Sequence, residues 1–268
     1  MTGSPIEGLA GWRRLDLMSV GSTNSEAMTL AHDGDPGHLW ITAGEQLSGR
    51  GRRGRGWTSP PGNLYASALM IDPAPPAALS LLPLVVAVAV RDAIAACGLP
   101  EGARLKIKWP NDILLNDAKC CGMLLESQNL RGGSMAVVFG CGINIVTYPD
   151  PGLYSATALN REGIAATPET LFLHLARAFD DALALWDRGR GIGAIRERWL
   201  ADAQGIGEAI TVNLANERVE GLFEGIDPNG ILLLRTGNGT LRPISAGDLF
   251  FDTSNIGGGT ASAREQQE

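Results

Sequence analysis

The strongest constraint on the fold is an apolar run near the middle of the chain. Residues 79–90 read LSLLPLVVAVAV, and the first charges after them are Arg91 and Asp92. The run is shorter than the roughly 20 residues that a helix needs to cross a bilayer. A helix over residues 78–97 is apolar on most of its faces, so it needs neighbours on most of its faces. The run therefore predicts a buried, central helix.

Strands and further helices are predicted on both sides of this run. The expected strands lie at residues 38–43, 63–71, 105–109 and 135–145, with two more around a turn at Asn116 and Asp117. Thr167 followed by Pro168 marks the start of a long helix, and residues 194–203 form another. Thr23 with Glu26 three residues later predicts a capping box at the start of an earlier helix. The pattern as a whole favours the α+β class.

The pattern changes at about Gly205. From there short strands follow one another closely, and residues 227–230 (DPNG) and 237–239 (GNG) have the composition of tight turns. Few apolar residues occur after Asp252, which is typical of disorder. The predicted divisions are a larger domain over residues 1–204, a small β-barrel domain over residues 205–252 and a disordered tail over residues 253–268.

Charge and cysteine content narrow the class of protein. The formal net charge of −7 argues against a general nucleic-acid binder, whose surface is usually basic. The four cysteines form no CxxC pair, and with only three histidines the chain suggests no structural zinc site. Unpaired cysteines suit a reducing compartment, and the N-terminus lacks the charged start and apolar run of a signal peptide. We therefore expect a cytoplasmic protein that does not enter a membrane.

One loop contradicts the acidic composition. Residues 49–57 read GRGRRGRGW, which concentrates Arg50, Arg52, Arg53 and Arg55 among glycines. Exposed backbone N–H groups and guanidinium forks bind phosphate and carboxylate oxygens, so an anionic ligand such as a nucleotide is expected. The common Walker phosphate loop is absent from the sequence. An RGG-like RNA contact or a solvated surface loop remains open from this motif alone.

Two further motifs place polar residues at strand ends. In KIKWPNDILLN, residues 106–116, Asn111 and Asp112 follow a proline that ends a strand, where functional residues often gather. In KCCGMLLE, Lys119 can serve as a point charge for a phosphate, and Gly122 allows a ligand to approach the backbone. Each motif also has an ordinary structural interpretation, as a strand–turn–strand connection and as a surface lysine beside a bulge.

A last motif, GCGINI, puts Gly140 and Gly142 inside an apolar strand, with Asn144 directly after it. Glycine weakens a strand and often marks the close approach of a ligand. In this order, the STN run at residues 22–24, the arginine–glycine loop, KWPND and GCGIN are similar to the motifs of the biotin protein ligases.

This resemblance extends from about Gly11 to Phe251. It implies a mixed seven-stranded sheet flanked by helices, as in class II synthetase-like catalytic domains, together with a C-terminal SH3-like barrel. It also implies that biotin and ATP condense to biotinyl-5′-AMP in the domain over residues 1–204. The biotinyl group then passes to one lysine of a biotin carboxyl carrier domain.

The resemblance also assigns functional positions. The implied catalytic residues are Lys119, Arg52 and Arg50. The implied biotin-binding residues are Ser22, Thr23, Asn24, Gln46, Arg50, Gly51, Arg52, Tyr65, Ser67, Lys119, Gly122, Leu124, Gly140 and Gly142. The implied ATP- or adenylate-binding residues are Arg52, Arg55, Trp57, Asn111, Asp112, Lys119 and Asn144. No protein ligands for a metal are assigned, although Mg²⁺ is expected to act with ATP. Joining two anions requires positive charge and positioning more than a histidine base.

The expected partners follow from the same resemblance. Some relatives carry an N-terminal helix-turn-helix domain and repress transcription, but only about ten residues precede Gly11 and Trp12. We therefore expect no specific DNA binding, and a monomer or weak homodimer. A lipoate–protein ligase shares the expected fold and chemistry and is the nearest alternative. An RNA-binding module that uses the arginine–glycine loop is the second.

Overall fold

The computed structural model describes residues 3–149, 155–214 and 216–251. Its main sheet has the order β1-β2-β3-β4-β8-β7-β6-β5, with β2 and β3 parallel and the other neighbours antiparallel. The strands are β1 (Ser4–Pro5), β2 (Arg13–Val20), β3 (Leu39–Gln46), β4 (Leu64–Ile71), β5 (Leu105–Lys108), β6 (Asp112–Leu115), β7 (Ala118–Asn129) and β8 (Met135–Ile143). The expected mixed sheet is confirmed, but the expected number of seven strands is wrong. A two-residue edge strand such as β1 has no recognisable sequence pattern of its own.

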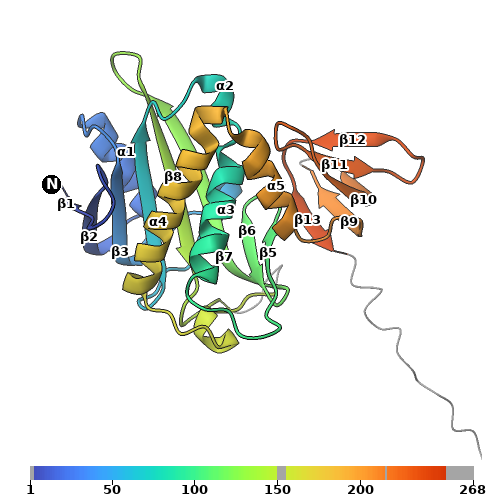
Figure 1. The fold of residues 1–268 in the computed structure, drawn as a ribbon, viewed down its shortest axis with the longest axis horizontal. Helices are drawn as coiled ribbons and strands as arrows, with labels where there is room; N and C mark the ends of the chain where they lie inside the picture. The colour runs from blue at the N-terminus through green and yellow to red at the C-terminus, as the bar shows by residue number, and fades with distance from the viewer. Residues whose placement is uncertain (1–2, 150–154, 215, 252–268) are drawn as a thin grey trace, which may run out of the picture.

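Helices cover the two faces of this sheet. They are α1 (Thr23–His32), α2 (Pro76–Leu79), α3 (Leu82–Ala95), α4 (Pro168–Trp186) and α5 (Ile192–Asp202), with short 3₁₀ turns η1 (Arg52–Gly54), η2 (Leu159–Glu162) and η3 (Asp187–Gly189). Figure 1 shows α3 and α4 side by side across the sheet. Alternate strand residues face opposite sides, so Val137 and Phe139 pack in the α3–α4 core whereas Ala136 and Val138 pack beneath α1.

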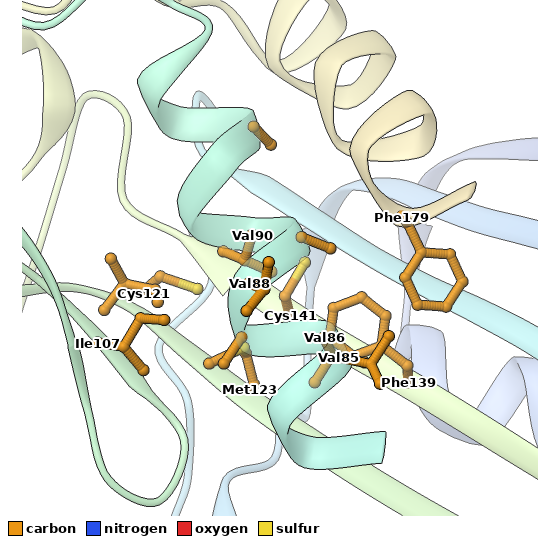
Figure 2. Packing of buried hydrophobic residues seen from close by; sticks show 14 of the residues in the cluster. Val85, Val86, Val88, Val90, Ile107, Cys121, Met123, Phe139, Cys141 and Phe179 are labelled. Atoms are coloured by element: carbon orange, nitrogen blue, oxygen red, sulfur yellow. The ribbon is translucent and has the colours of Figure 1, made fainter. Parts of the chain in front are cut away.

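The apolar run forms the central helix that its composition predicts. Ten residues of α3 are buried, and Figure 2 shows Val85, Val86 and Val88 among side chains of the sheet and Phe179 of α4. The predicted helix over residues 78–97 is nevertheless interrupted, because α2 ends at Leu79 and α3 begins at Leu82. Pro83 lies in the first turn of α3, where its missing N–H costs nothing.

The two predicted helix starts differ in outcome. Thr167 does cap α4, since its hydroxyl accepts a hydrogen bond from the Thr170 backbone at 3.2 Å. The capping box predicted for Thr23 is wrong, because Ser22 occupies the N-cap of α1 and makes no side-chain cap bond. The Thr23 hydroxyl instead reaches the side chain of Gln46 at 3.1 Å. The Thr23 side chain therefore contributes to the pocket described below and does not cap the helix.

A second, five-stranded antiparallel sheet follows the helices. It consists of β9 (Ala209–Asn213), β10 (Arg218–Ile226), β11 (Leu232–Arg235), β12 (Leu241–Ile244) and β13 (Asp248–Phe251), in the order β12-β11-β10-β9-β13. One of its contacts with the main sheet and its helices involves Trp109, whose indole donates to the Gly230 carbonyl at 3.4 Å. The expected disordered tail, residues 253–268, lies outside the described residues. Within the described part of the chain, no helix is long and apolar enough to cross a membrane.

Candidate active site

A pocket of about 370 Å³ opens on the sheet face that carries α1. Most of the residues implied by the resemblance line it, although they come from segments spread over more than a hundred positions. The lining includes Ser22, Thr23, Asn24, Gln46, Arg50, Gly51, Arg52, Arg55, Trp57, Asn111, Asp112, Lys119, Gly122, Leu124, Gly140, Gly142 and Asn144. The motifs thus converge on one place in the fold.

Tyr65 and Ser67 lie behind this lining. The Tyr65 hydroxyl donates to the Pro60 carbonyl at 2.7 Å, and burial raises the pKa of this side chain to about 12. The fully buried Ser67 hydroxyl lies 2.6 Å from Asn24 Oδ1 and 2.7 Å from Thr23 Oγ1. Ser67 therefore holds two residues of the pocket in place, whereas Tyr65 fixes the backbone at Pro60.

The floor of the pocket is made by glycines of β7 and β8. A Cβ atom at Gly140 would lie 1.9 Å from Asn24 Oδ1, and one at Gly142 would lie 2.2 Å from Trp57 Nε1. At Gly122 it would lie 2.8 Å from the Trp57 ring. The glycines are therefore required where Asn24 and the indole of Trp57 pack directly on the sheet. The Trp57 N–H is buried and has no acceptor among the described residues.

The N-terminus of α1 forms the neutral, hydrogen-bonding end of the pocket. Gln46 Oε1 accepts from the Thr23 backbone N–H at 2.9 Å and lies 3.1 Å from the Thr23 hydroxyl. Gln46 Nε2 donates to Ser59 Oγ at 2.9 Å, and Ser59 in turn donates to the Trp57 carbonyl at 3.0 Å. Helix N-terminal backbone and fixed hydroxyls suit a small polar, uncharged ligand group.

The arginine–glycine loop is folded over the pocket by its own side chains. Arg50 makes two hydrogen bonds to Glu126, at 2.9 and 2.7 Å, and Arg52 donates to Asn111 Oδ1 at 3.0 Å. Arg53 and Arg55 both pair with Asp248 of β13, each at 3.0 Å. Burial lowers the pKa of Arg52, against the opposing influence of Asp248.

Lysines add positive charge at the other end. Lys119 Nζ lies 2.7 Å from Asp112 Oδ1 and 5.4 Å from the centre of the Trp57 ring. Lys108 is only 6% exposed, and burial lowers the pKa of its ammonium to about 8, although Asp112 opposes this shift. This end of the pocket is therefore cationic, partly desolvated and suited to a ligand with carboxylate and phosphate groups.

Several pocket residues were not predicted as site residues. The additional lining residues are Gly56, Thr58, Lys108, Trp109, Pro110, Met123, Cys141, Pro149, Ser155, Ala156, Asp248 and Leu249. Lys108 and Trp109 lie within the KIKWPNDILLN motif, although only Asn111 and Asp112 of that motif were predicted as site residues. Asp248 sits in a strand with no motif, and only the folded structure brings it to Arg53 and Arg55. No group of three or more metal-ligating side chains occurs among the described residues.

Comparison with known proteins identifies what this pocket belongs to. The model of the "Biotin/lipoate A/B protein ligase family" matches residues 20–144, and that of the "Biotin protein ligase C terminal domain" matches residues 205–252. The biotin–[acetyl-CoA-carboxylase] ligase of Paracoccus denitrificans is 42% identical over 243 residues, which cover 88% of this chain and 99% of that protein. The enzyme of the same name from Mycobacterium tuberculosis is 31% identical, with 90% of both chains covered.

The fold agrees with these sequence matches. The structure described as biotin protein ligase from Aquifex aeolicus in complex with biotin and ATP superposes with a TM-score of 0.75 at 24% identity. The superposition covers 89% of this chain and 99% of the Aquifex aeolicus chain. Given the 42% identical relative, matched over nearly its whole length, the chain belongs to the biotin protein ligase family.

Proposed function

We propose that this protein is a biotin–[acetyl-CoA-carboxylase] ligase, which activates biotin with ATP and transfers it to a carrier protein. The observation that carries the proposal is the two-ended pocket, with a neutral hydrogen-bonding end at Thr23 and Gln46 and a cationic end at Lys119. Biotin has a neutral ureido ring at one end and a carboxylate at the other. The family membership and the names of the two relatives agree with this chemistry.

In the first step, a carboxylate oxygen of biotin attacks the α-phosphorus of ATP, and pyrophosphate leaves. The product is biotinyl-5′-AMP, a mixed anhydride. Both reactants are anions, so the main requirement is positive charge near the phosphoryl oxygens. We assign this role to Lys119, Arg50 and Arg52. Mg²⁺ enters with the triphosphate as part of the substrate, and Asp112 is a carboxylate of the lining that could meet it.

In the second step, the neutral amine of an acceptor lysine attacks the acyl carbonyl of the adenylate. AMP leaves, and the nitrogen loses a proton as the amide forms. The acceptor is proposed to be the biotin carboxyl carrier domain, consistent with the names of the relatives. We further propose that Trp57 and Asn111 contact the nucleotide, while Ser22 and Thr23 contact the ureido ring.

The surroundings of the reaction remain predictions. Four free cysteines, three of them buried, support a cytoplasmic location, and ATP is available there. A monomer or weak homodimer that does not bind DNA is the expected state. Sedimentation velocity and a titration with duplex DNA at several salt concentrations test these two points.

A direct assay tests the proposed function. The protein is incubated with ATP, Mg²⁺, biotin and a biotin carboxyl carrier domain, and the carrier is analysed by intact mass. One added biotinyl group is expected, and replacing biotin with lipoic acid should give no product. Modification with lipoic acid alone would favour the lipoate ligase alternative. RNA binding without acyl transfer would favour the RNA-binding alternative.

A further inference from the structure

Glu126 is the last residue of the KCCGMLLE motif, and the sequence predicts no functional role for it. In the structure it contacts two parts of the pocket. It lies on β7 opposite Val138 of β8, on the same face of the sheet as Gly122 and Leu124. Both of its carboxylate oxygens accept from Arg50, at 2.9 Å for Oε1 and 2.7 Å for Oε2. This is the bidentate arrangement in which arginine binds a carboxylate most strongly.

The same carboxylate also holds Asn24, which packs directly on Gly140 in the floor of the pocket. Glu126 Oε2 accepts a second hydrogen bond, from Asn24 Nδ2, at 2.8 Å. Asn24 is 4% exposed, and its Oδ1 atom lies 2.6 Å from the Ser67 hydroxyl. Glu126 is 29% exposed at its side chain and stands outside the pocket lining. It therefore acts on a ligand only through the residues that it holds.

These contacts close a circuit of hydrogen bonds. From Arg50 it runs through Glu126, Asn24, Ser67 and Thr23, then from the Thr23 backbone N–H through Gln46 and Ser59 to the Trp57 carbonyl. Arg50 and Trp57 stand near the two ends of the arginine–glycine loop. The loop is therefore tied at both ends to the floor on which the ligand would rest. Glu126 is the charged member of this circuit outside the loop.

We propose that Glu126 is a positioning residue for the ligase reaction proposed above. Its carboxylate fixes the Arg50 guanidinium for the carboxylate of biotin and sets the amide of Asn24 at the same time. The guanidinium keeps further N–H donors beyond the two taken by Glu126, so Arg50 can hold Glu126 and a ligand together. Formation of the loop and of the biotin pocket is thereby coupled.

A carboxylate is needed at this position because every neighbouring group that it binds is a donor. Oε2 receives both an arginine N–H and an amide N–H. Glutamine has a single acceptor oxygen, and its NH₂ group would face a donor of Arg50 or of Asn24. The substitution Glu126→Gln therefore removes the charge and at least one hydrogen bond with almost no change in volume.

Steady-state kinetics of Glu126→Gln test the proposal. We expect the KM for biotin to rise by about tenfold, and the KM for ATP to change by less than about twofold, because the lost contacts are charge-assisted and lie at the biotin side. Glu169→Gln is the matched control, since Glu169 also holds an arginine with both oxygens, at 2.8 and 2.6 Å to Arg14, but outside the pocket. Both variants should melt within about 3 °C of each other.

A double-mutant cycle separates positioning from a merely structural role. In an Arg50→Ala background, Glu126→Gln should raise the KM for biotin by less than about threefold, because its main partner is already absent. A full tenfold effect in that background would overturn the proposal. So would an unchanged KM for biotin in the single variant, or equal increases in both KM values with a lower melting temperature. Absence of carrier biotinylation by the unmodified protein would instead refute the proposed function.

Discussion

Lys108 and Lys119 enter the same end of the pocket in different electrostatic surroundings. Lys119 has a direct ion pair with Asp112 at 2.7 Å, whereas the pKa of Lys108 is lowered mainly by burial. Lys119 also lowers the pKa of Lys108 through repulsion. At neutral pH the ammonium group of Lys108 carries charge at a cost that an anionic ligand can relieve.

Replacing Lys119 with alanine should abolish most adenylate formation. An ammonium near the α-phosphate stabilises charge that grows in the transition state, so the rate should fall on the order of 10²–10³-fold. Pyrophosphate exchange measures this step alone. Lys106→Ala is the control, because Lys106 lies on β5 of the same sheet but outside the lining, and it should retain the rate within about twofold. A Lys119→Ala variant with near-normal exchange would show that this lysine is only a structural partner of Asp112.

The lowered pKa of Lys108 predicts a pH effect on nucleotide use. The ammonium loses its proton as the pH rises through about 8, so kcat/KM for ATP should fall above this pH. Arginine stays charged throughout this range, so Lys108→Arg should abolish the decline. Stability should change in the opposite direction, rising from about pH 8 toward 10.5, because the unfolded chain binds the proton more tightly. The same decline in Lys108→Arg would assign it to another group.

At the scale of elements, the arginine–glycine loop is a short segment held by several others. Arg50 contacts β7, Arg52 contacts the turn between β5 and β6, and Arg53 and Arg55 contact β13. The arginines that repel one another in the open chain are thus each given an acceptor when the loop folds. A bound carboxylate and phosphate would add acceptors for Arg50 and Arg52, which line the pocket.

Arg52→Gly should release the intermediate from this loop. The contact to Asn111 at 3.0 Å fastens the middle of the loop to the rim, and its loss would open a route for biotinyl-AMP. With labelled biotin and added serum albumin, the variant should label albumin well above the unmodified protein. Arg104→Gly is the control, since Arg104 forms an exposed pair with Asp117 and lies outside both the loop and the lining. If the Arg52 variant consumes ATP without extra albumin labelling, the arginine serves binding alone.

Across the whole molecule, local sequence patterns account for most elements, and the resemblance to the biotin protein ligases accounts for most of the pocket lining. The central helix, the β-strands around Asn116 and the start of α4 each carry their own signal in apolar spacing or turn residues. Glu126 and Asp248 do not, because their importance comes from arginines far away in the chain. The capping box at Thr23 failed for a related reason, since the pocket uses that hydroxyl instead. Pairing between distant segments depends on the completed fold.

Asp248 joins the second sheet to the arginine–glycine loop, so a substitution in the second sheet should change the behaviour of the loop. Asp248→Asn removes the charge that pairs with Arg53 and Arg55. Trypsin should then cleave within residues 49–57 at least about threefold faster, since local opening becomes easier. Glu220→Gln is the control, because Glu220 forms an exposed pair with Arg218 on β10, in the same sheet. Equal cleavage of both variants would mean that Asp248 does not restrain the loop.

The tie between the loop and β13 also bears on how the protein is made. Residues 49–57 leave the ribosome early, whereas Asp248 lies in the last described strand, so the loop can pair with Asp248 only after β13 has been synthesised. A nascent chain can therefore build the sheet and the floor of the pocket while the loop still lacks this restraint. Full retention of a reactive adenylate would be acquired near the end of synthesis, so a truncated translation product would be the leakier enzyme.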